Sequence, residues 1–517
     1  MTTRAVTPYR SPVTAPRESF WHLVHAEWTK FRTVRGWVIA VLVTILAITA
    51  FAFLAGSISG GCTAVSGASA AASTAACPVQ PTGPGGEPVQ DAFYFVHRQL
   101  TGNGTITAQL TSLTGQVDVG PGSNGQPQTA PGLWPWSKAG IMIKEDTAQG
   151  SAYAAVMATG SHGVRMQWDY VNDTPGLPGS VPVSAPRWLR LVRDGDTVTG
   201  YDSADGAHWM RAGTVALPGL TATVQAGLFT AAPGTDAATV TGVFRHIGLS
   251  WPATGWTATN VGGTGPNGVG QPGTLSQSGG ALTVTGGSGD IAPAAGISVQ
   301  RALLGTFFGL IPLIVVSAMF MTGEYRCGLI RVSLTAAPRR GRLLAAKAVV
   351  IGAVGFVAGL VAATLALAVA TPIVRRTGIP VWPASPLTEA RMVAGTGALL
   401  ALAGVLALAI GTIVRRSAPA IAGVIVVIFV PYLLAFGPLS GGHGRAGAGG
   451  GGWALQVTPV AAMAAQQALP KFYQATAVYR VSDGYYPLPG WAGLAVECAW
   501  AAAALALAFY LLRRRDA

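Results

Sequence analysis

The stretch VVIGAVGFVAGLVAATLALAVATPIV, from Val349 to Val374, decides the fold class of this chain, because it contains no charged side chain. An α-helix rises about 1.5 Å per residue, so about 20 apolar residues cross the roughly 30 Å hydrocarbon core of a bilayer. Buried core helices of a soluble protein are the alternative, but such helices almost never lack charge over this length. The stretch predicts a transmembrane helix.

Five more apolar runs of similar length make six predicted spans, with a long gap after the first. The first run is interpreted as a retained span and not as a cleaved signal peptide, because it is long and no compelling Ala-x-Ala site follows it. The six runs are Trp37–Ser57, Ala302–Met321, Ala348–Pro372, Met392–Val414, Ala418–Pro438 and Gly490–Leu512.

The charges agree with a multi-pass protein of the cell membrane. Only 10% of the 517 residues are charged and 50% are hydrophobic, whereas about 25% of a soluble protein is charged. This composition argues against a purely soluble enzyme. With the N-terminus in the cytoplasm, 17 Lys and Arg fall in the short inside segments and 6 in the short outside loops, so both termini are expected inside. Residues 58–298 are then extracellular, with a net charge of −4. The high pI reflects this topology, and no nucleic-acid partner is expected.

Residues 58–298 are expected to hold a Gly/Ala/Ser/Pro-rich linker at 58–90 and an all-β domain at 91–298. Short strands with turn residues every 8 to 12 positions are typical of a sandwich. The strand candidates are Ala92–Arg98, Gly104–Ser112, Ser137–Glu145, Ala152–Ala158, Val164–Tyr170, Arg187–Arg193, Thr197–Ser203, Ala222–Thr230 and Ala238–Leu249.

The amino-acid sequences of several predicted strands resemble those of the concanavalin A-like (laminin-G-like) jelly-roll domains of bacterial surface proteins. The segment Gly280–Ala292 looks like the opening strand of such a domain although it follows the closing one. We therefore expect this segment to complete the sandwich and the two ends of the domain to lie together. The motifs that carry the resemblance are DAFYF (91–95), KAGIMIK (138–144), WLRLVR (188–193), SADGAHW (203–209) and QAGLF (225–229).

Chemistry is not expected in this domain. Glu145 and Asp146 are adjacent and would point to opposite faces of a strand, so no catalytic pair and no metal site are predicted. Trp134 and Trp136 are the candidates for ligand contact by stacking on a sugar, with core packing as the alternative. Cys62 and Cys77 are expected to form a disulfide in the oxidising outside compartment.

Two regions on the cytoplasmic side resemble the permease subunits of type 2 ABC exporters. Residues 20–32 place apolar and polar side chains on opposite faces of a helix, as interfacial helices do. The N-terminal motif is AEWTKFR (26–32), and the motifs after the second span are EYRCGLIR (324–331), LTAAPRR (334–340) and LLAAK (343–347). The resemblance implies an interfacial helix in the tail 1–36, with Glu27, Trp28 and Lys30. It also implies a coupling loop at 322–347 with these site residues: Glu324, Tyr325, Arg326, Gly328, Arg331, Pro338, Arg339 and Arg340.

This resemblance implies a coupling loop that docks on a cytoplasmic ABC ATPase, and a second permease copy that is either identical or different. The chain has no G-x-x-x-x-G-K-[ST] phosphate loop, so ATP and Mg²⁺ are expected on the ATPase and no cofactor on this chain. The alternative for the loop arginines is anchoring to anionic lipid.

The sequence thus predicts a six-span permease subunit of an ATP-driven exporter, with spans two to six in residues 299–517 and a lectin-like domain of recognition or gating role outside. Glu497, within the last span, is a candidate intramembrane polar site or a structural hydrogen-bonding group. The alternative function is a membrane-anchored protein that binds envelope glycan and transports nothing. A glycan is a candidate partner under both hypotheses.

Overall fold

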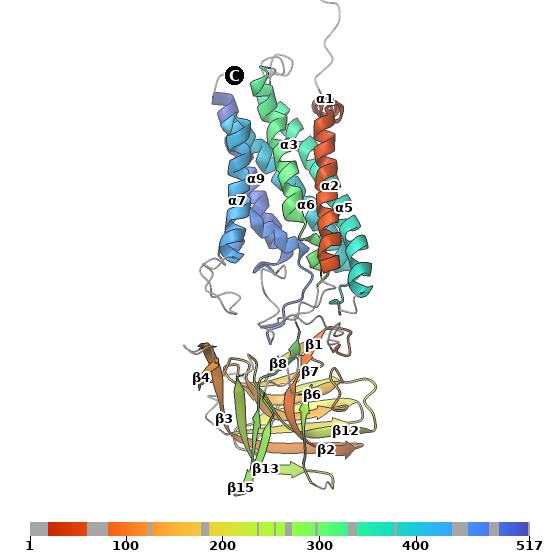
Figure 1. The fold of residues 1–517 in the computed structure, drawn as a ribbon, viewed down its shortest axis with the longest axis vertical. Helices are drawn as coiled ribbons and strands as arrows, with labels where there is room; N and C mark the ends of the chain where they lie inside the picture. Colours follow the sequence, from red (N-terminus) through yellow and green to blue (C-terminus); the bar gives the residue numbers. More distant parts are fainter. Residues whose placement is uncertain are drawn as a thin grey trace, which may run out of the picture.

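The chain forms a bundle of long helices with a β-sandwich at one end (Figure 1). Helix α1 lies at the other end, which we call the α1 end (Figure 1). The described residues of this computed structural model are 19–58, 81–121, 127–176, 186–234, 237–252, 255–263, 271–294, 298–328, 339–376, 380–436, 453–474 and 485–514.

The six predicted spans are confirmed, because six helices among the described residues are long and apolar enough to cross a membrane. They are α2 (Arg35–Ile58), α3 (Thr306–Arg326), α5 (Arg340–Arg376), α6 (Pro386–Val414), α7 (Ser417–Phe436) and α9 (Gly490–Arg514). The other helical segments are α1 (Phe20–Thr33), η1 (Val299–Leu303), α8 (Ala454–Val457) and η3 (Pro459–Gln466).

Helices α5 and α6 approach closely because glycines face each other across the contact. A Cβ atom on Gly359 would lie 2.7 Å from Cα of Gly397, and one on Gly355 would lie 2.9 Å from the carbonyl oxygen of Leu400. A larger side chain at either glycine would push the helices apart. Gly355 and Gly359 therefore pack against α6 inside the bundle.

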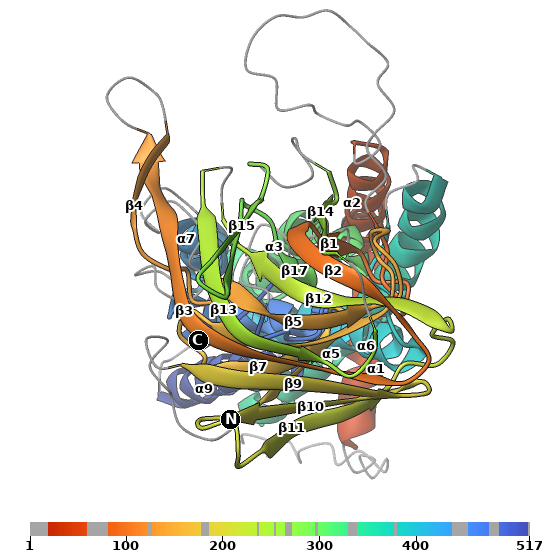
Figure 2. The ribbon, with the colours of Figure 1, turned by 90° about the horizontal axis from the view of Figure 1, so that it is seen from below.

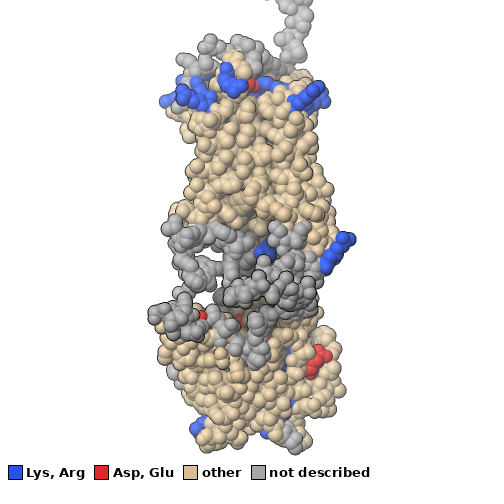
Figure 3. Space-filling model, in the orientation of Figure 1, with Lys and Arg blue, Asp and Glu red and all other residues tan. Residues whose placement is uncertain are grey.

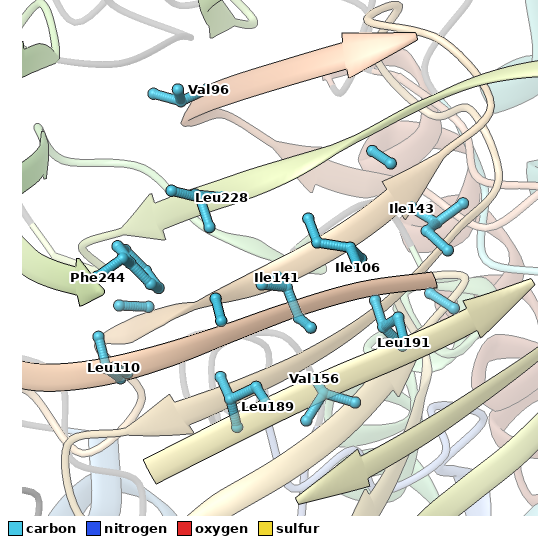
Figure 4. Packing of buried hydrophobic residues seen from close by; sticks show 14 of the residues in the cluster. Val96, Ile106, Leu110, Ile141, Ile143, Val156, Leu189, Leu191, Leu228 and Phe244 are labelled. Carbon is cyan, nitrogen blue, oxygen red and sulfur yellow. The ribbon is translucent and has the colours of Figure 1, made fainter. Parts of the chain in front are cut away.

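The domain between the first two spans is a sandwich of a seven-stranded and an eight-stranded antiparallel sheet. Figure 2 shows both sheets from the side away from the helices, with β2 and β12 in one and β3, β9, β10 and β11 in the other. The core lies between the sheets, where Val96, Ile141 and Leu228 of one sheet meet Ile106 and Leu191 of the other (Figure 4).

All nine predicted strands have counterparts in the sandwich. The seven-stranded sheet runs β14 (Thr257–Val261), β2 (Phe93–Thr101), β12 (Thr223–Ala231), β5 (Lys138–Lys144), β6 (Tyr153–Thr159), β7 (Val164–Trp168) and β8 (Asn172–Pro175). The eight-stranded sheet runs β11 (Met210–Ala216), β10 (Thr197–Ser203), β9 (Arg187–Asp194), β3 (Gly104–Pro121), β13 (Thr239–Leu249), β16 (Ala281–Gly286) and β15 (Thr274–Ser278), and β4 (Pro127–Pro131) pairs with β3.

The segment Gly280–Ala292 completes the domain, as expected. Strand β16 pairs with β13, and the next strand, β17 (Ile291–Pro293), pairs with β1 (Val89–Asp91), so the two ends of the domain lie side by side. Strand β1 begins inside the segment that was expected to be linker.

Two buried lysines hold these two ends against the seven-stranded sheet. Lys138 and Lys144 stand at the two ends of β5, six residues apart and therefore on the same face of the strand. Lys138 Nζ donates to Asp290 Oδ1 at 2.7 Å, and Lys144 Nζ donates to Asp91 Oδ2 at 2.9 Å. Tyr170 also donates to Asp91 Oδ2, at 2.7 Å. Both chain ends are thus ion-paired to one strand.

The sandwich contacts loops of the helical part. Trp382, before α6, donates from Nε1 to the carbonyl oxygen of Ala294 at 3.2 Å. Gln474, between η3 and α9, donates from Nε2 to the carbonyl oxygen of Tyr170 at 3.0 Å. Trp382 and Leu469 also form a small apolar cluster with Val171. The domain is therefore packed on the bundle at Tyr170 and Val171, besides its two chain connections.

We expect the stability of the sandwich to fall with acidification through His97. This side chain is buried between Gln225 Oε1 at 2.7 Å and Thr259 Oγ1 at 3.1 Å, and burial lowers the pKa of the imidazole below its ordinary value of 6.5. Below about pH 6.5 the unfolded chain binds a proton that the folded chain does not, so folding becomes less favourable as the pH falls towards the folded-state pKa. The measurement is the melting temperature at pH 7.5 and 5.5, which should change less in His97→Gln than in the wild type. Equal changes in both proteins would contradict this role.

Candidate functional site: a buried charge cluster at the α1 end

Charged side chains are unevenly distributed over the helical part. Figure 3 shows Lys and Arg side chains gathered at the α1 end, above a long surface of uncharged residues. The six candidate spans account for this uncharged surface, because lipid disfavours exposed charge. Three further charges at the α1 end are buried, and a fourth, partly exposed lysine pairs with them.

These four side chains form the buried charge cluster: Glu27 and Lys30 of α1, Glu324 of α3 and Lys347 of α5. Lys347 Nζ donates to Glu27 Oε2 and to Glu324 Oε1, both at 2.7 Å. Lys30 Nζ donates to the same oxygen of Glu324. Lys347 is 0%, Glu324 4% and Glu27 6% exposed. Lys30, whose side chain is 31% exposed, lies at the edge of the cluster. Two lysines thus balance two glutamates.

Helix α1 supplies its part of the cluster through its spacing. Glu27, Lys30 and Phe31 are three and four residues apart and therefore share one face. The helix ends at Thr33 because Val34 has an extended backbone, with ψ of 99°, and α2 begins at Arg35. This break lets α1 leave the direction of the first span and pack its inner face on α5.

Aromatic side chains surround the cluster. Lys347 Nζ lies 4.3 Å from the ring centroid of Phe320, where the ring face attracts a cation. The Phe320 ring is 5.8 Å from that of Phe31 and 5.1 Å from that of Trp37. Water is largely excluded, so the ion pairs are strong and the loss of one partner is costly.

The cluster joins α1, the end of α3 and the start of α5. Glu324 lies in the last turn of α3 and Lys347 in the second turn of α5, so in the sequence they stand on either side of the segment 327–339.

The structure brings together three of the sequence-predicted residues, Glu27, Lys30 and Glu324. Trp28, also predicted for the interfacial helix, points away and is 43% exposed. One expectation is corrected: Glu324, Tyr325 and Arg326 are not in a loop but in the last turn of α3, because the helix continues past the apolar run.

The other predicted coupling residues lie around the cluster, not in it. The Tyr325 ring centroid is 5.1 Å from the guanidinium carbon of Arg415, which connects α3 to the end of α6. Arg326, Gly328 and Arg339 are exposed. The remaining members of the predicted loop are Arg340, which donates to the carbonyl oxygen of Leu512 at 3.0 Å, and Arg331 and Pro338, which lie outside the described residues.

Lys347 is the member that sequence reasoning did not select as a site residue. The resemblance includes it only as the last residue of the predicted coupling loop. The signal was present: a lysine directly before the charge-free stretch of the third span requires a buried partner or a path to the membrane surface.

The comparison with protein families decides the identity of the chain. The sequence model described as "ABC-2 family transporter protein" matches residues 21–517, from the second residue of α1 to the last residue given. This chain belongs to the ABC-2 transporter family. It is therefore a permease subunit of an ABC transporter, and the family implies an ABC ATPase as its partner.

Comparison of the permease with curated proteins finds no match. Among solved structures, a functionally unknown protein from Saccharomyces cerevisiae shares 13% identity over 31% of this chain and 75% of that one, with a TM-score of 0.20. Scytalido-glutamic peptidase with a transition state analog inhibitor shares 11% identity over 38% of this chain and 98% of that one, with a TM-score of 0.25. At these TM-scores neither structure defines the fold of this chain.

The remaining predicted site residues of the permease are separate from the cluster. Glu497 of α9 is 2% exposed, and its Oε2 has no hydrogen-bond partner among the residues that the structure describes. Trp136 is 5% exposed and stacks on His162 with centroids 4.0 Å apart, so its ring is not open to a sugar, whereas Trp134 is half-buried.

Cys62 and Cys77 lie outside the described residues. Within the described ranges, no three His, Cys, Asp or Glu side chains gather as metal ligands would.

Proposed function

We propose that this permease subunit works in an ATP-driven exporter, with its α1 end in the cytoplasm and the sandwich outside. ATP and Mg²⁺ bind to the separate ATPase, and a second permease copy, identical or different, completes the transport path. The distribution of basic residues supports this orientation, because the α1 end carries most of the Lys and Arg of the helical part (Figure 3).

The buried charge cluster carries the proposal for coupling. Its ion pairs connect α1, the end of α3 and the start of α5 on both sides of the segment 327–339. When the ATPase pushes on this segment, the three helix ends move as one unit, because separating any of them would leave a charge buried and unpaired. A nucleotide-driven motion thereby reaches the first, second and third spans together.

The sandwich acts as a part of the permease that recognises or gates cargo. Lys138 and Lys144 hold both connections of the domain, and Trp382 and Gln474 contact it from loops of the helical part. A domain held at these points responds to movements of the spans. A mere anchor for a glycan-binding domain would need none of these contacts.

The first experiment is purification of the tagged chain in mild detergent from its own host. An ATPase subunit should co-elute, and the eluate should hydrolyse ATP. If no protein with a phosphate loop co-elutes even after cross-linking, and the sandwich binds envelope glycan, the chain is a glycan-binding membrane protein and the exporter proposal fails.

A further inference from the structure

A cavity of about 640 Å³ lies at the α1 end, between the start of α5 and the end of α9. Arg340 Nη1 donates to the carbonyl oxygen of Leu512 at 3.0 Å, which connects the two helices. A Cβ atom on Gly341 would lie 1.9 Å from the Phe509 ring, so only glycine allows this approach. The described residues that line the cavity are Arg339, Arg340, Gly341, Arg342, Ala345, Phe509 and Arg513.

The cavity is strongly positive. Four of the described lining residues are arginines, and none of them is acidic. The first turn of α5 also has no acidic residue, so the partial positive charge of the helix start adds to that of the side chains. Guanidinium groups match the geometry of phosphate oxygens and bind them with paired hydrogen bonds. The chemistry is that of a site for a phosphate-bearing anion.

An apolar surface continues from the cavity along α5. Ala345 lines the cavity, and Val349 follows it by four residues on the same face, 42% exposed. Phe356 follows two turns later, 38% exposed. Because α5 is a candidate span, this strip faces the region of lipid acyl chains. A ligand that fills both places has a phosphate head and an apolar tail.

The geometry points to a binding site for an anionic phospholipid, with its phosphate headgroup among the arginines and an acyl chain along α5. This inference depends on the proposed function only for the choice of leaflet. With the α1 end in the cytoplasm, the lipid belongs to the cytoplasmic leaflet. Neither transport nor the ATPase is needed for the lipid to bind, so a failure of the exporter proposal would leave this site testable.

The test is native mass spectrometry of the delipidated full chain in detergent, titrated with phosphatidylglycerol or phosphatidylcholine. We expect phosphatidylglycerol to bind at least tenfold more tightly. The double variant Arg342→Gln/Arg513→Gln should lose this preference, because each arginine contributes to the attraction of an anionic headgroup. The matched control is Arg375→Gln/Arg376→Gln, at the exposed other end of α5, which should bind as the wild type does.

Three results would overturn the inference. The first is equal binding of the two lipids by the wild type, and the second is unchanged lipid preference in the double variant. If that variant aggregates, the single variants Arg342→Gln and Arg513→Gln carry the same test. The third is displacement of phosphatidylglycerol by an equal concentration of glycerol 3-phosphate, which would indicate a soluble phosphorylated ligand. If the double variant keeps its lipid preference but loses the co-eluting ATPase, the cavity is a protein-docking surface.

Discussion

Lys347→Met is expected to destabilise the permease and to uncouple it from its ATPase. The variant leaves Glu27 buried without its ion-pair partner and Glu324 with Lys30 alone. Removing one partner of a buried ion pair typically costs about 3–5 kcal/mol, so the melting temperature in detergent should fall by roughly 3–5 °C. Vesicles that contain the variant and the ATPase should keep ATP hydrolysis but lose most export.

A double variant separates the effect of an unpaired buried charge from the effect of losing the ion pair between α1 and α5. In Lys347→Met/Glu27→Gln the pair of Lys30 and Glu324 remains and no carboxylate is left without a partner, so most of the lost stability should return. Export should stay low, because α1 is no longer ion-paired to α5. Arg326→Gln, which removes an exposed arginine in the same turn as Glu324, should change stability by less than about 0.5 kcal/mol. Wild-type export by Lys347→Met would contradict the coupling role.

Lys144→Met is expected to release one chain connection of the sandwich. Lys144 Nζ donates to Asp91 Oδ2 and, at 2.9 Å, to the Tyr170 hydroxyl, and both Lys144 and Asp91 are almost completely buried. The variant leaves the carboxylate inside the domain without a cation. A cost of about 3–5 kcal/mol is expected, measured as earlier thermal unfolding and as faster proteolysis near β1.

Two controls accompany this variant. Asp91→Asn/Lys144→Met removes both charges and keeps an acceptor for the Tyr170 hydroxyl and for the backbone of Gly150, so it should recover part of the loss. Arg211→Met changes an exposed basic residue of the same domain and should be nearly neutral. If Lys144→Met unfolds and is cleaved as the wild type is, the ion pair does not hold the connection.

The spans and most strands were predictable because their signal is local. A charge-free run such as Val349–Val374 has one stable solution in a membrane, and the alternation of strands such as β9 specifies one buried face. Strands β14 and β15 were not predicted, because most of their side chains are at least partly exposed and show no regular apolar alternation. They are held by pairing with β2 and β16, which only the fold supplies.

The cluster was predictable only in part, since its members come from distant positions. Lys30 and Glu324 are 294 residues apart, and Lys347 and Glu27 are 320 apart. The resemblance of two motifs to type 2 ABC exporter permeases identified Glu27, Lys30 and Glu324 as candidates, but nothing local indicates which cation meets which anion. The pairing depends on the turn at Val34, which aims α1 at α5.

Because β1 pairs with β17, the two ends of the sandwich lie close enough for the domain to be deleted or exchanged as one unit. Directly paired Cα atoms on neighbouring strands lie about 4.5–5.5 Å apart. A tight turn that joined Val89 to Pro293 would therefore replace the entire domain without moving the spans on either side. Gain or loss of the domain therefore needs no new path for the chain between the first two spans, and only the loop residues that contact the sandwich, such as Trp382 and Gln474, would lose their partners.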